Sequence, residues 1–207
     1  MKDWLKLIVI GTLLGVTGAR AAEMAPDELA RATTEDVLAI VKKDKDIQSG
    51  NQKKIFDLVE ARIVPHFDFT RMTQLAVGRY WRQASPSQQQ ALASEFRTLL
   101  VRTYSSAFTQ YRNQSVEFKP LRANPGDTEV TVRSEIRESG RPPVPIDYAM
   151  QKTANGWKVF DVTVEGVSLV TTYRGTFSEE VQRGGIDGLI KTLAEKNKTP
   201  ASTAAKK

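Results

Sequence analysis

The stretch GWKVFDVTVEGVSLVTT, from Gly156 to Thr172, predicts a strand that leads into a helix. Its first half is rich in β-branched and aromatic residues, which fit a pleated strand. Strict alternation puts Trp157 and Val159 on one face and Phe160 and Val162 on the other. Both faces are largely apolar or neutral, so we expect other elements to cover both of them.

The second half of this stretch changes period after Glu165-Gly166. Apolar residues then recur at steps of three and four, from Val167 through Val170 and Tyr173 to Phe177, which predicts a helix over 167–182. We expect Gly175 to interrupt this helix and Gly184-Gly185 to end it. A final short helix follows, with its apolar face from Ile186 to Leu193.

The residues before this stretch predict three further strands. Apolar and polar residues alternate at 116–118, 130–136 and 146–150. A turn at Gly140–Pro143 and a tight hairpin at Asn155-Gly156 separate the later strands. Short connections between about four successive strands predict an antiparallel meander.

The first half of the chain predicts helices, which brings the total to about seven. They cover 26–46, 55–63, 68–78 and 85–112, with a short piece at Tyr80-Trp81. The start of the longest helix has the clearest local signal: Ser85 can serve as N-cap, Pro86 as the first helical residue and Gln88 as the partner in a capping box. The fold class is therefore α+β, a small antiparallel sheet wrapped by helices.

The N-terminus resembles a secretory signal peptide rather than part of the fold. Lys2 and Lys6 precede an apolar run from Leu7 to Val16, and Ala19-Arg20-Ala21 supplies small residues for cleavage. We expect residues 1–21 to be removed, 22–196 to form one domain and 197–207 to be a disordered tail. The chain has no cysteine, which fits a bacterial periplasm.

The charge balance argues against a nucleic-acid partner. The net charge is +6, of which the signal peptide supplies +2. The mature part is mildly basic, which suits transient approach to an anionic lipid surface. A nucleic-acid-binding surface would need clustered basic residues with interleaved aromatics.

No pattern of catalytic or metal-binding residues stands out in the sequence. His66 is the only histidine, no serine lies in a nucleophile elbow, and no Walker loop or dinucleotide fingerprint is present. Asp161 and Glu165 could form a carboxylate pair, but the end of a strand and the start of a turn explain them better. We therefore expect no enzyme activity, no cofactor and no metal.

Several short motifs, in order and with their spacing, resemble the MlaC family, also called the toluene-tolerance auxiliary family. They are Ser85-Pro86 with Gln88, Phe96-Arg97, Gly140–Val144, Gly156-Trp157, Asp161, Glu165–Ser168, Thr171-Thr172 and Gly185–Leu189. The resemblance covers nearly all of the mature chain.

The resemblance implies a soluble periplasmic phospholipid carrier that shuttles lipid between the two membranes and maintains outer-membrane lipid asymmetry. Its expected partners are phospholipid, an outer-membrane lipoprotein–porin complex and an inner-membrane ABC transporter with an MCE-domain subunit. It implies acyl chains inserted into an apolar cavity between the sheet and the helices. We expect a monomer that approaches membranes only transiently.

The resemblance supplies no pocket signature, so the expected lipid-binding residues come from the periodicity of the chain. For the acyl-chain cavity they are Phe69, Met72, Leu75, Phe96, Leu99, Leu100, Phe108, Val116, Phe118, Val132, Ile146, Tyr148, Met150, Phe160, Val162, Val164, Val167 and Val170. For the headgroup at the mouth they are Arg97, Arg102 and Tyr104. The helix over 68–78 and the helix after Gly166 are the walls that we expect to move.

Two other functions stay open at this point. The apolar residues could fill an ordinary core, and the protein could then be a periplasmic adaptor or chaperone-like module that binds protein and no lipid. A hydrolase would require a nucleophile and a base that the sequence does not offer.

Overall fold

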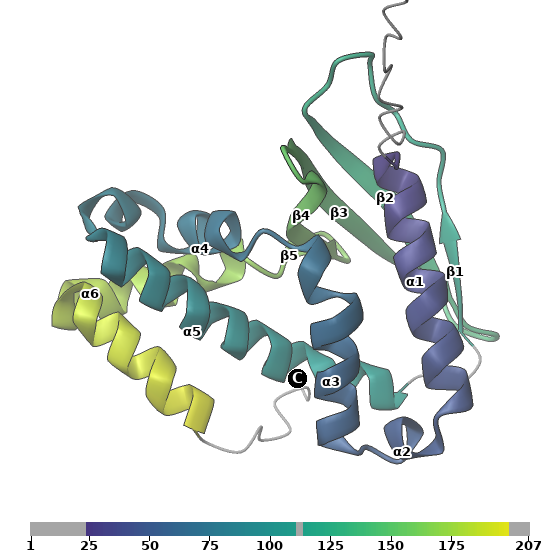
Figure 1. Cartoon of the computed structure of the whole chain (residues 1–207), viewed down its shortest axis with the longest axis horizontal. Helices are drawn as coiled ribbons and strands as arrows, with labels where there is room; N and C mark the ends of the chain where they lie inside the picture. The colour runs from purple at the N-terminus through teal and green to yellow at the C-terminus, as the bar shows by residue number, and fades with distance from the viewer. Residues whose placement is uncertain (1–23, 111–113, 199–207) are drawn as a thin grey trace, which may run out of the picture.

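The computed structural model describes residues 24–110 and 114–198. Its sheet and the helix in front of it occupy one side of the molecule, and a group of helices occupies the other (Figure 1). The predicted signal peptide and nearly all of the predicted tail lie outside the described residues.

Six α-helices are present in these two ranges: α1 (Pro26–Lys43), α2 (Lys45–Gln48), α3 (Gln52–Arg62), α4 (Phe69–Val77), α5 (Pro86–Tyr104) and α6 (Arg174–Lys198). Short 3₁₀ segments connect them: η1 (Val64–His66), η2 (Gly78–Gln83), η3 (Ser105–Gln110) and η4 (Thr171–Tyr173). The predicted 26–46 helix is divided because Asp44 leaves helical geometry and its carboxylate accepts the backbone N–H groups of Asp46 and Ile47, which caps α2.

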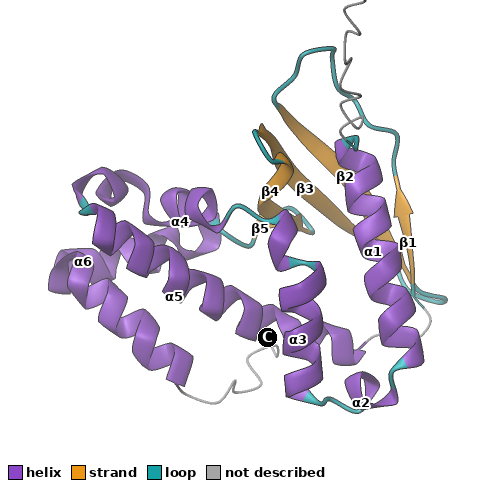
Figure 2. Ribbon diagram, in the orientation of Figure 1, coloured by secondary structure: helices purple, strands orange, loops and turns teal. Residues whose placement is uncertain are grey.

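The sheet has five antiparallel strands in chain order: β1 (Ser115–Phe118), β2 (Glu129–Arg137), β3 (Val144–Thr153), β4 (Gly156–Val164) and β5 (Val167–Ser168). Figure 2 shows these strands as one curved layer behind α1. The predicted meander is confirmed, and one short strand is added to the four expected.

The expected helix after Glu165-Gly166 was wrong at its start. Glu165 and Gly166 both have positive φ angles, 51° and 82°, which is the geometry of a two-residue hairpin turn. Val167 therefore turns back as β5 and pairs with Val164. The helix begins only at Arg174, and Gly175 does not interrupt it. The predicted break at Gly184-Gly185 is confirmed, because Gly185 has non-helical geometry inside α6.

A bulge in β4 makes the predicted face assignment wrong. Ala149 pairs with Asp161 but the next residue, Met150, pairs with Val159, so Phe160 is the extra residue. Since a bulge shifts the alternation by one, Trp157 and Val159 lie on the same face as Val162 and Val164.

One face of β2 is open to solvent. On β2 the residues from Val130 to Ser134 alternate between exposed and buried, as in a sheet with one solvated face. The exposed face carries ion pairs, among them Arg137 with Glu117 at 2.6 Å and Lys119 with Glu135 at 3.0 Å. On β4, the strand for which two covered faces were expected, no residue is exposed, and Arg71 of α4 lies over Phe160 on the second face, which agrees with the expectation.

The core is divided into three apolar clusters. The largest joins α4, α5 and α6 around Phe96 and Leu92, both 0% exposed. The second lies on the covered face of the sheet, and the third holds α1, α2 and α3 together around Val41 and Ile55. Phe67, which follows η1, packs against both the first and the second cluster.

The predicted capping box at the start of α5 is confirmed. The Ser85 hydroxyl accepts the Gln88 backbone N–H, and the Gln88 side chain accepts the Ser85 N–H. The α-helix ends at Tyr104, earlier than expected, and continues as η3.

We expect Ser85→Ala to lower the free energy of unfolding by about 1 kcal/mol, because two N-terminal N–H groups of α5 lose their capping arrangement. Denaturant unfolding followed by circular dichroism measures this change. Ser94→Ala, on the exposed side of the same helix, is the matched control and should leave the midpoint within the experimental error.

Candidate functional site

The middle of the covered sheet face is not fully buried, and the accessible space beside its half-buried residues is called the hollow below. Val132 and Met150 on this face are 0% exposed and Val159 is 5% exposed. Tyr148 and Val162, which pair with each other on β3 and β4, nevertheless keep accessible surface. Side chains in the centre of a covered face stay accessible only where the covering layer does not fill the space above them.

Tyr148 lies at the centre of this face, between Val132 of β2 and Val162 of β4. Its ring stacks against that of Phe118, with ring centres 6.4 Å apart, and burial raises the pKa of its phenol group. The residue is nevertheless partly accessible.

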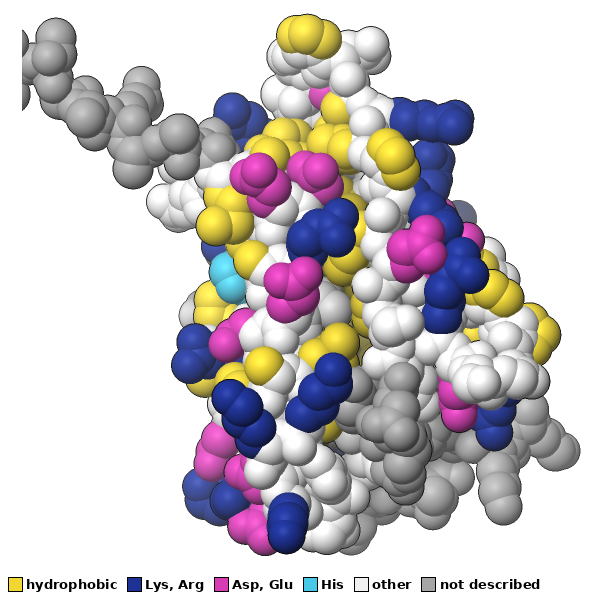
Figure 3. Space-filling view, turned by 90° about the vertical axis from the view of Figure 1, so that its right-hand side faces the viewer, with side chains coloured by type: hydrophobic (Ala, Val, Ile, Leu, Met, Phe, Trp, Pro, Cys, Tyr) yellow, Lys and Arg dark blue, Asp and Glu magenta, His cyan; other side chains and the backbone are white. Residues whose placement is uncertain are grey.

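The hollow continues into an apolar groove between α1 and the sheet. Figure 3 looks at this side and shows hydrophobic side chains at the bottom of a groove beside the charged outer face of α1. Leu29 and Ala30 from α1 and Val116 and Leu121 from the β1 region are half-buried and pack around the sheet cluster.

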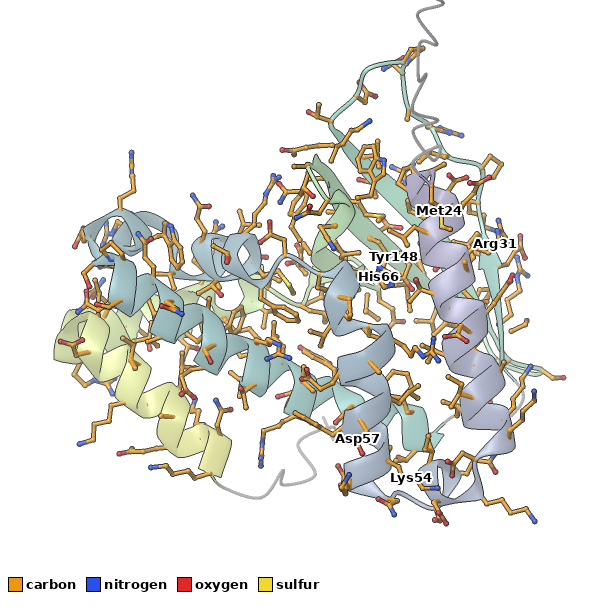
Figure 4. The ribbon with its side chains drawn as sticks, viewed as in Figure 1. Met24, Arg31, Lys54, Asp57, His66 and Tyr148 are labelled. Atoms are coloured by element: carbon orange, nitrogen blue, oxygen red, sulfur yellow. The ribbon has the colours of Figure 1, made fainter. Side chains whose placement is uncertain are left out.

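Arg31 marks the rim of this groove. Its guanidinium lies 5.0 Å from the centre of the Phe118 ring, and the side chain is exposed. Figure 4 shows Arg31 on α1 and Tyr148 on the sheet behind it. A cation at the edge of an apolar groove is suited to a ligand with an apolar body and an anionic end.

The junction between η1 and α4 is hydrogen-bonded to the sheet. The Asp68 N–H donates to the Val159 carbonyl at 2.8 Å, and the Asp68 carboxylate accepts from Gln151 Nε2 at 2.5 Å. The guanidinium carbon of Arg71 lies 3.6 Å from the centre of the ring of Phe160, the bulge residue. Arg71 also forms an ion pair with Glu129. This network ties α4 to the sheet, so α4 is held more firmly than we expected of a moving wall.

The residues expected to line the acyl-chain cavity are divided between several places. One group lies in the core of the helical lobe, the part of the molecule formed by α4, α5 and α6. Its members are Phe69, Met72, Leu75, Phe96, Leu99, Leu100 and Val170. Those on the covered sheet face are Val116, Phe118, Val132, Ile146, Tyr148, Met150, Val162 and Val164. Phe108 packs against the α1–α3 cluster, Phe160 lies on the bulge under Arg71, and Val167 is 57% exposed at a hairpin tip.

The three residues expected at the mouth lie along α5, in the helical lobe. Arg97 forms an ion pair with Glu60 and lies 5.8 Å from the centre of the Phe69 ring. Burial, together with the neighbouring Tyr173, raises the pKa of Tyr104. Arg102 is half-buried near the end of this helix.

Sequence reasoning missed Arg31 at the rim of the groove, because no periodic or capping pattern marks its position in α1. Ser134 shares the inward face with Val130 and Val132, as the alternation predicts, but we expected no role for it. A polar residue at an inward-facing strand position is the signal that could have identified it.

Asp161 has a structural role. Its carboxylate accepts from the Ser168 hydroxyl at 2.6 Å and from the Val170 N–H at 3.3 Å. The interpretation that Asp161 orients the turn is confirmed.

Within residues 24–110 and 114–198, no group of three or more His, Cys, Asp and Glu side chains could hold a metal ion. His66 is half-buried at the end of η1, and burial together with Lys158 lowers its pKa. In the same two ranges, no helix has the length and apolarity needed to cross a membrane.

Comparisons with known proteins point to one family. The family model described as MlaC protein matches residues 31–195. The toluene tolerance protein ttg2D of Pseudomonas putida is 26% identical over 173 residues, which cover 83% of this chain and 80% of that protein. The intermembrane phospholipid transport system binding protein MlaC of Haemophilus influenzae is 20% identical over 204 residues, 97% of this chain and 95% of that protein.

A solved structure is also similar. It is a phospholipid-binding protein from Ralstonia solanacearum in complex with a phospholipid, at 1.53 Å resolution. The two chains are 43% identical with a TM-score of 0.80, and the match covers 86% of this chain and 100% of that chain.

Proposed function

Since this chain belongs to the MlaC protein family, we propose that it is a phospholipid-binding transport protein that holds the acyl chains of its lipid over the covered face of the sheet. The observation that carries this proposal is the apolar groove between α1 and the sheet, which is lined by half-buried residues such as Leu29, Val116 and Val162. The 43% identical protein that was solved with a phospholipid supports it.

The physical demand on such a carrier is large. Each methylene that is buried contributes about 0.8 kcal/mol, so two acyl chains contribute on the order of 20 kcal/mol in total. A carrier must provide a comparable apolar enclosure, and it must open to release the lipid. The groove between α1 and the sheet provides an apolar path to the outside.

The place of this protein in transport follows from the same proposal. It works in the periplasm after removal of residues 1–21, as a monomer that carries lipid between an outer-membrane lipoprotein–porin complex and an inner-membrane ABC transporter with an MCE-domain subunit. The signal-peptide pattern of the sequence and the name of the Haemophilus relative support this. The lipid is a ligand that is moved without chemical change.

Extraction of the purified mature protein with organic solvent, followed by mass spectrometry, tests the function. We expect about one phospholipid or more per chain. A protein that contains no phospholipid and takes up none from vesicles would contradict the proposal and favour the alternative of a protein-binding adaptor.

We expect Arg31→Gln to weaken the retention of an anionic phospholipid several-fold, because a charge-assisted hydrogen bond to the phosphate is lost at a partly solvated rim. Retention after incubation with phosphatidylglycerol vesicles at low and high salt measures the effect, which should shrink at high salt. Arg82→Gln, at an exposed position of η2, is the control. Equal retention by both variants would remove Arg31 from the headgroup site.

A further inference from the structure

A recess is present where α4 meets the sheet and the start of α6. Its volume is about 570 Å³, within the range of roughly 300–1,000 Å³ that is typical of small-molecule sites. It is lined by residues of α4, η2, β3 and α6, namely Arg71, Gln74, Leu75, Gly78, Gln151 and Arg174. Among the described residues that line it, two are cationic and none is acidic.

The recess and the groove lie on opposite faces of the sheet. Gln151 pairs with Glu129 across β2 and β3. Their chain neighbours Met150 and Val130 belong to the sheet cluster on which α1 packs. Successive side chains of a strand point to opposite faces, so Gln151 points away from α1. A ligand in the recess therefore does not compete with a lipid in the groove.

Arg71 is held in a fixed orientation at one side of the recess. Its guanidinium carbon lies 3.6 Å from the centre of the Phe160 ring. One of its nitrogens donates to the Gln151 side chain, and another donates to the Glu129 carboxylate at 2.8 Å. The Gln151 amide is fixed in turn by the Asp68 carboxylate, 2.5 Å from Nε2. A guanidinium has more N–H groups than these two bonds use, so donors remain for a ligand.

Arg174 supplies a positive charge that no ion pair balances. Its Nε and Nη2 donate to the Leu75 carbonyl near the end of α4, at 3.1 and 2.9 Å. In the described part of the chain, no carboxylate forms an ion pair with Arg174. The carbonyl orients the guanidinium without neutralising it, and Nη1 stays available to an anion.

Two guanidinium groups from separate elements suit a phosphate better than a carboxylate. The fork of a single guanidinium satisfies a carboxylate, whereas the oxygens of a phosphate point in tetrahedral directions and accept from several donors. The side chain of Gln74 is exposed between the two arginines on the chain of lining residues and can add an amide donor.

We propose that this recess binds a phosphate group, either free in solution or in a phospholipid headgroup at a membrane surface. The inference goes beyond the proposed function, because the site is separate from the groove and works whether or not the groove contains a lipid.

Titration of the mature protein with inorganic phosphate tests the site. At constant ionic strength, set with sodium chloride, we expect the NMR signals of the Arg71 and Arg174 Nε–H groups to shift and saturate with a Kd on the order of 1 mM, as for a few charge-assisted hydrogen bonds at an open site. Unchanged signals would overturn the inference. Succinate should bind more weakly, and equal or tighter binding of succinate would overturn the assignment to phosphate in favour of an acidic protein segment.

Gln74→Glu is the decisive variant, because it leaves both arginines and their hydrogen bonds in place. The new carboxylate repels phosphate, so we expect the affinity to fall about tenfold or more. Gln90→Glu, at an exposed position of α5, makes the same change of charge elsewhere and should bind as wild type. Equal affinities of the two variants would overturn the inference. Should Gln74→Glu fail to fold, Arg174→Gln provides the same test, with Arg82→Gln as its control.

Vesicles distinguish the two sources of phosphate. The same variants are sedimented with phosphatidylglycerol vesicles. Weaker sedimentation of Gln74→Glu than of Gln90→Glu, by several-fold, supports a headgroup at the membrane surface. Equal sedimentation, together with the loss of inorganic phosphate binding, supports free phosphate. Neither result depends on the lipid that is extracted from the groove, so a failure of the proposed function would be seen separately.

Discussion

Replacement of Val162 by glutamate should reduce the phospholipid content of the purified protein at least tenfold. Val162 lies beside Tyr148 on the covered sheet face and keeps accessible surface there. A carboxylate at this position can stay hydrated while the hollow contains water, but a lipid chain would strip that water from it. Burying an unpaired charge costs several kcal/mol, which the chain must overcome to bind.

Thr131→Glu is the matched control for this change. Thr131 is exposed on the opposite face of the same sheet and also carries a β-branched side chain. We expect it to retain as much lipid as wild type. Organic extraction and mass spectrometry measure the lipid, and thermal unfolding shows that both variants are folded. A folded Val162→Glu variant with its full lipid content would exclude Val162 from the binding site.

The choice of Val162 depends on a feature that the sequence did not reveal. Alternation along β4 correctly placed Val162 with Val164, but it put both of them opposite Trp157 and Val159. The bulge at Phe160 brings the side chains of Trp157 and the three valines to one face. Bulges carry no dependable local signal, because the partner strand decides where the extra residue is accommodated.

The connection after β4 shows a second limit of periodicity. Steps of three and four from Val167 suggested a helix, and Val170 and Phe177 are indeed buried in the helical cluster. The backbone at Glu165 and Gly166 nevertheless forms a hairpin turn. Gly166 is a signal for such a turn, because glycine readily adopts the positive φ angle that the turn requires. The hairpin turn at Glu165 and Gly166 determines the local backbone, and only the later part of the apolar pattern, from Arg174 on, lies in a helix.

Strong local signals were read correctly. The capping box at Ser85 and the turn at Gly140 both appear where the sequence placed them. The hollow was not accessible to such reasoning. Tyr148 and Val162 stay partly accessible on a covered face, and the spacing between two layers is a property of packing rather than of any local pattern.

Among the residues expected to line the lipid cavity, Phe96 provides the sharpest contrast with Val162. Its side chain is 0% exposed and packs edge-on against Tyr173 and Phe177, with ring centres 5.1 Å away in both cases. No part of it faces the hollow. We therefore expect Phe96 to contribute to the stability of the helical lobe.

Phe96→Ala should lower the free energy of unfolding by about 3–5 kcal/mol, because it removes buried apolar surface and leaves a cavity between α5 and α6. Denaturant unfolding measures the loss. Phe56→Ala is the matched control, since Phe56 is 40% exposed on α3, and its removal should cost less than 1 kcal/mol.

Phe96→Ala and Val162→Glu together test whether stability and lipid binding depend on different residues. Below the unfolding transition, Phe96→Ala should retain phospholipid in the wild-type ratio, because the groove between α1 and the sheet is built from other residues. Val162→Glu should show the reverse, a small change in stability and a large loss of lipid. If Phe96→Ala loses its lipid while still folded, the acyl chains extend into the helical cluster, and the binding site is larger than the groove.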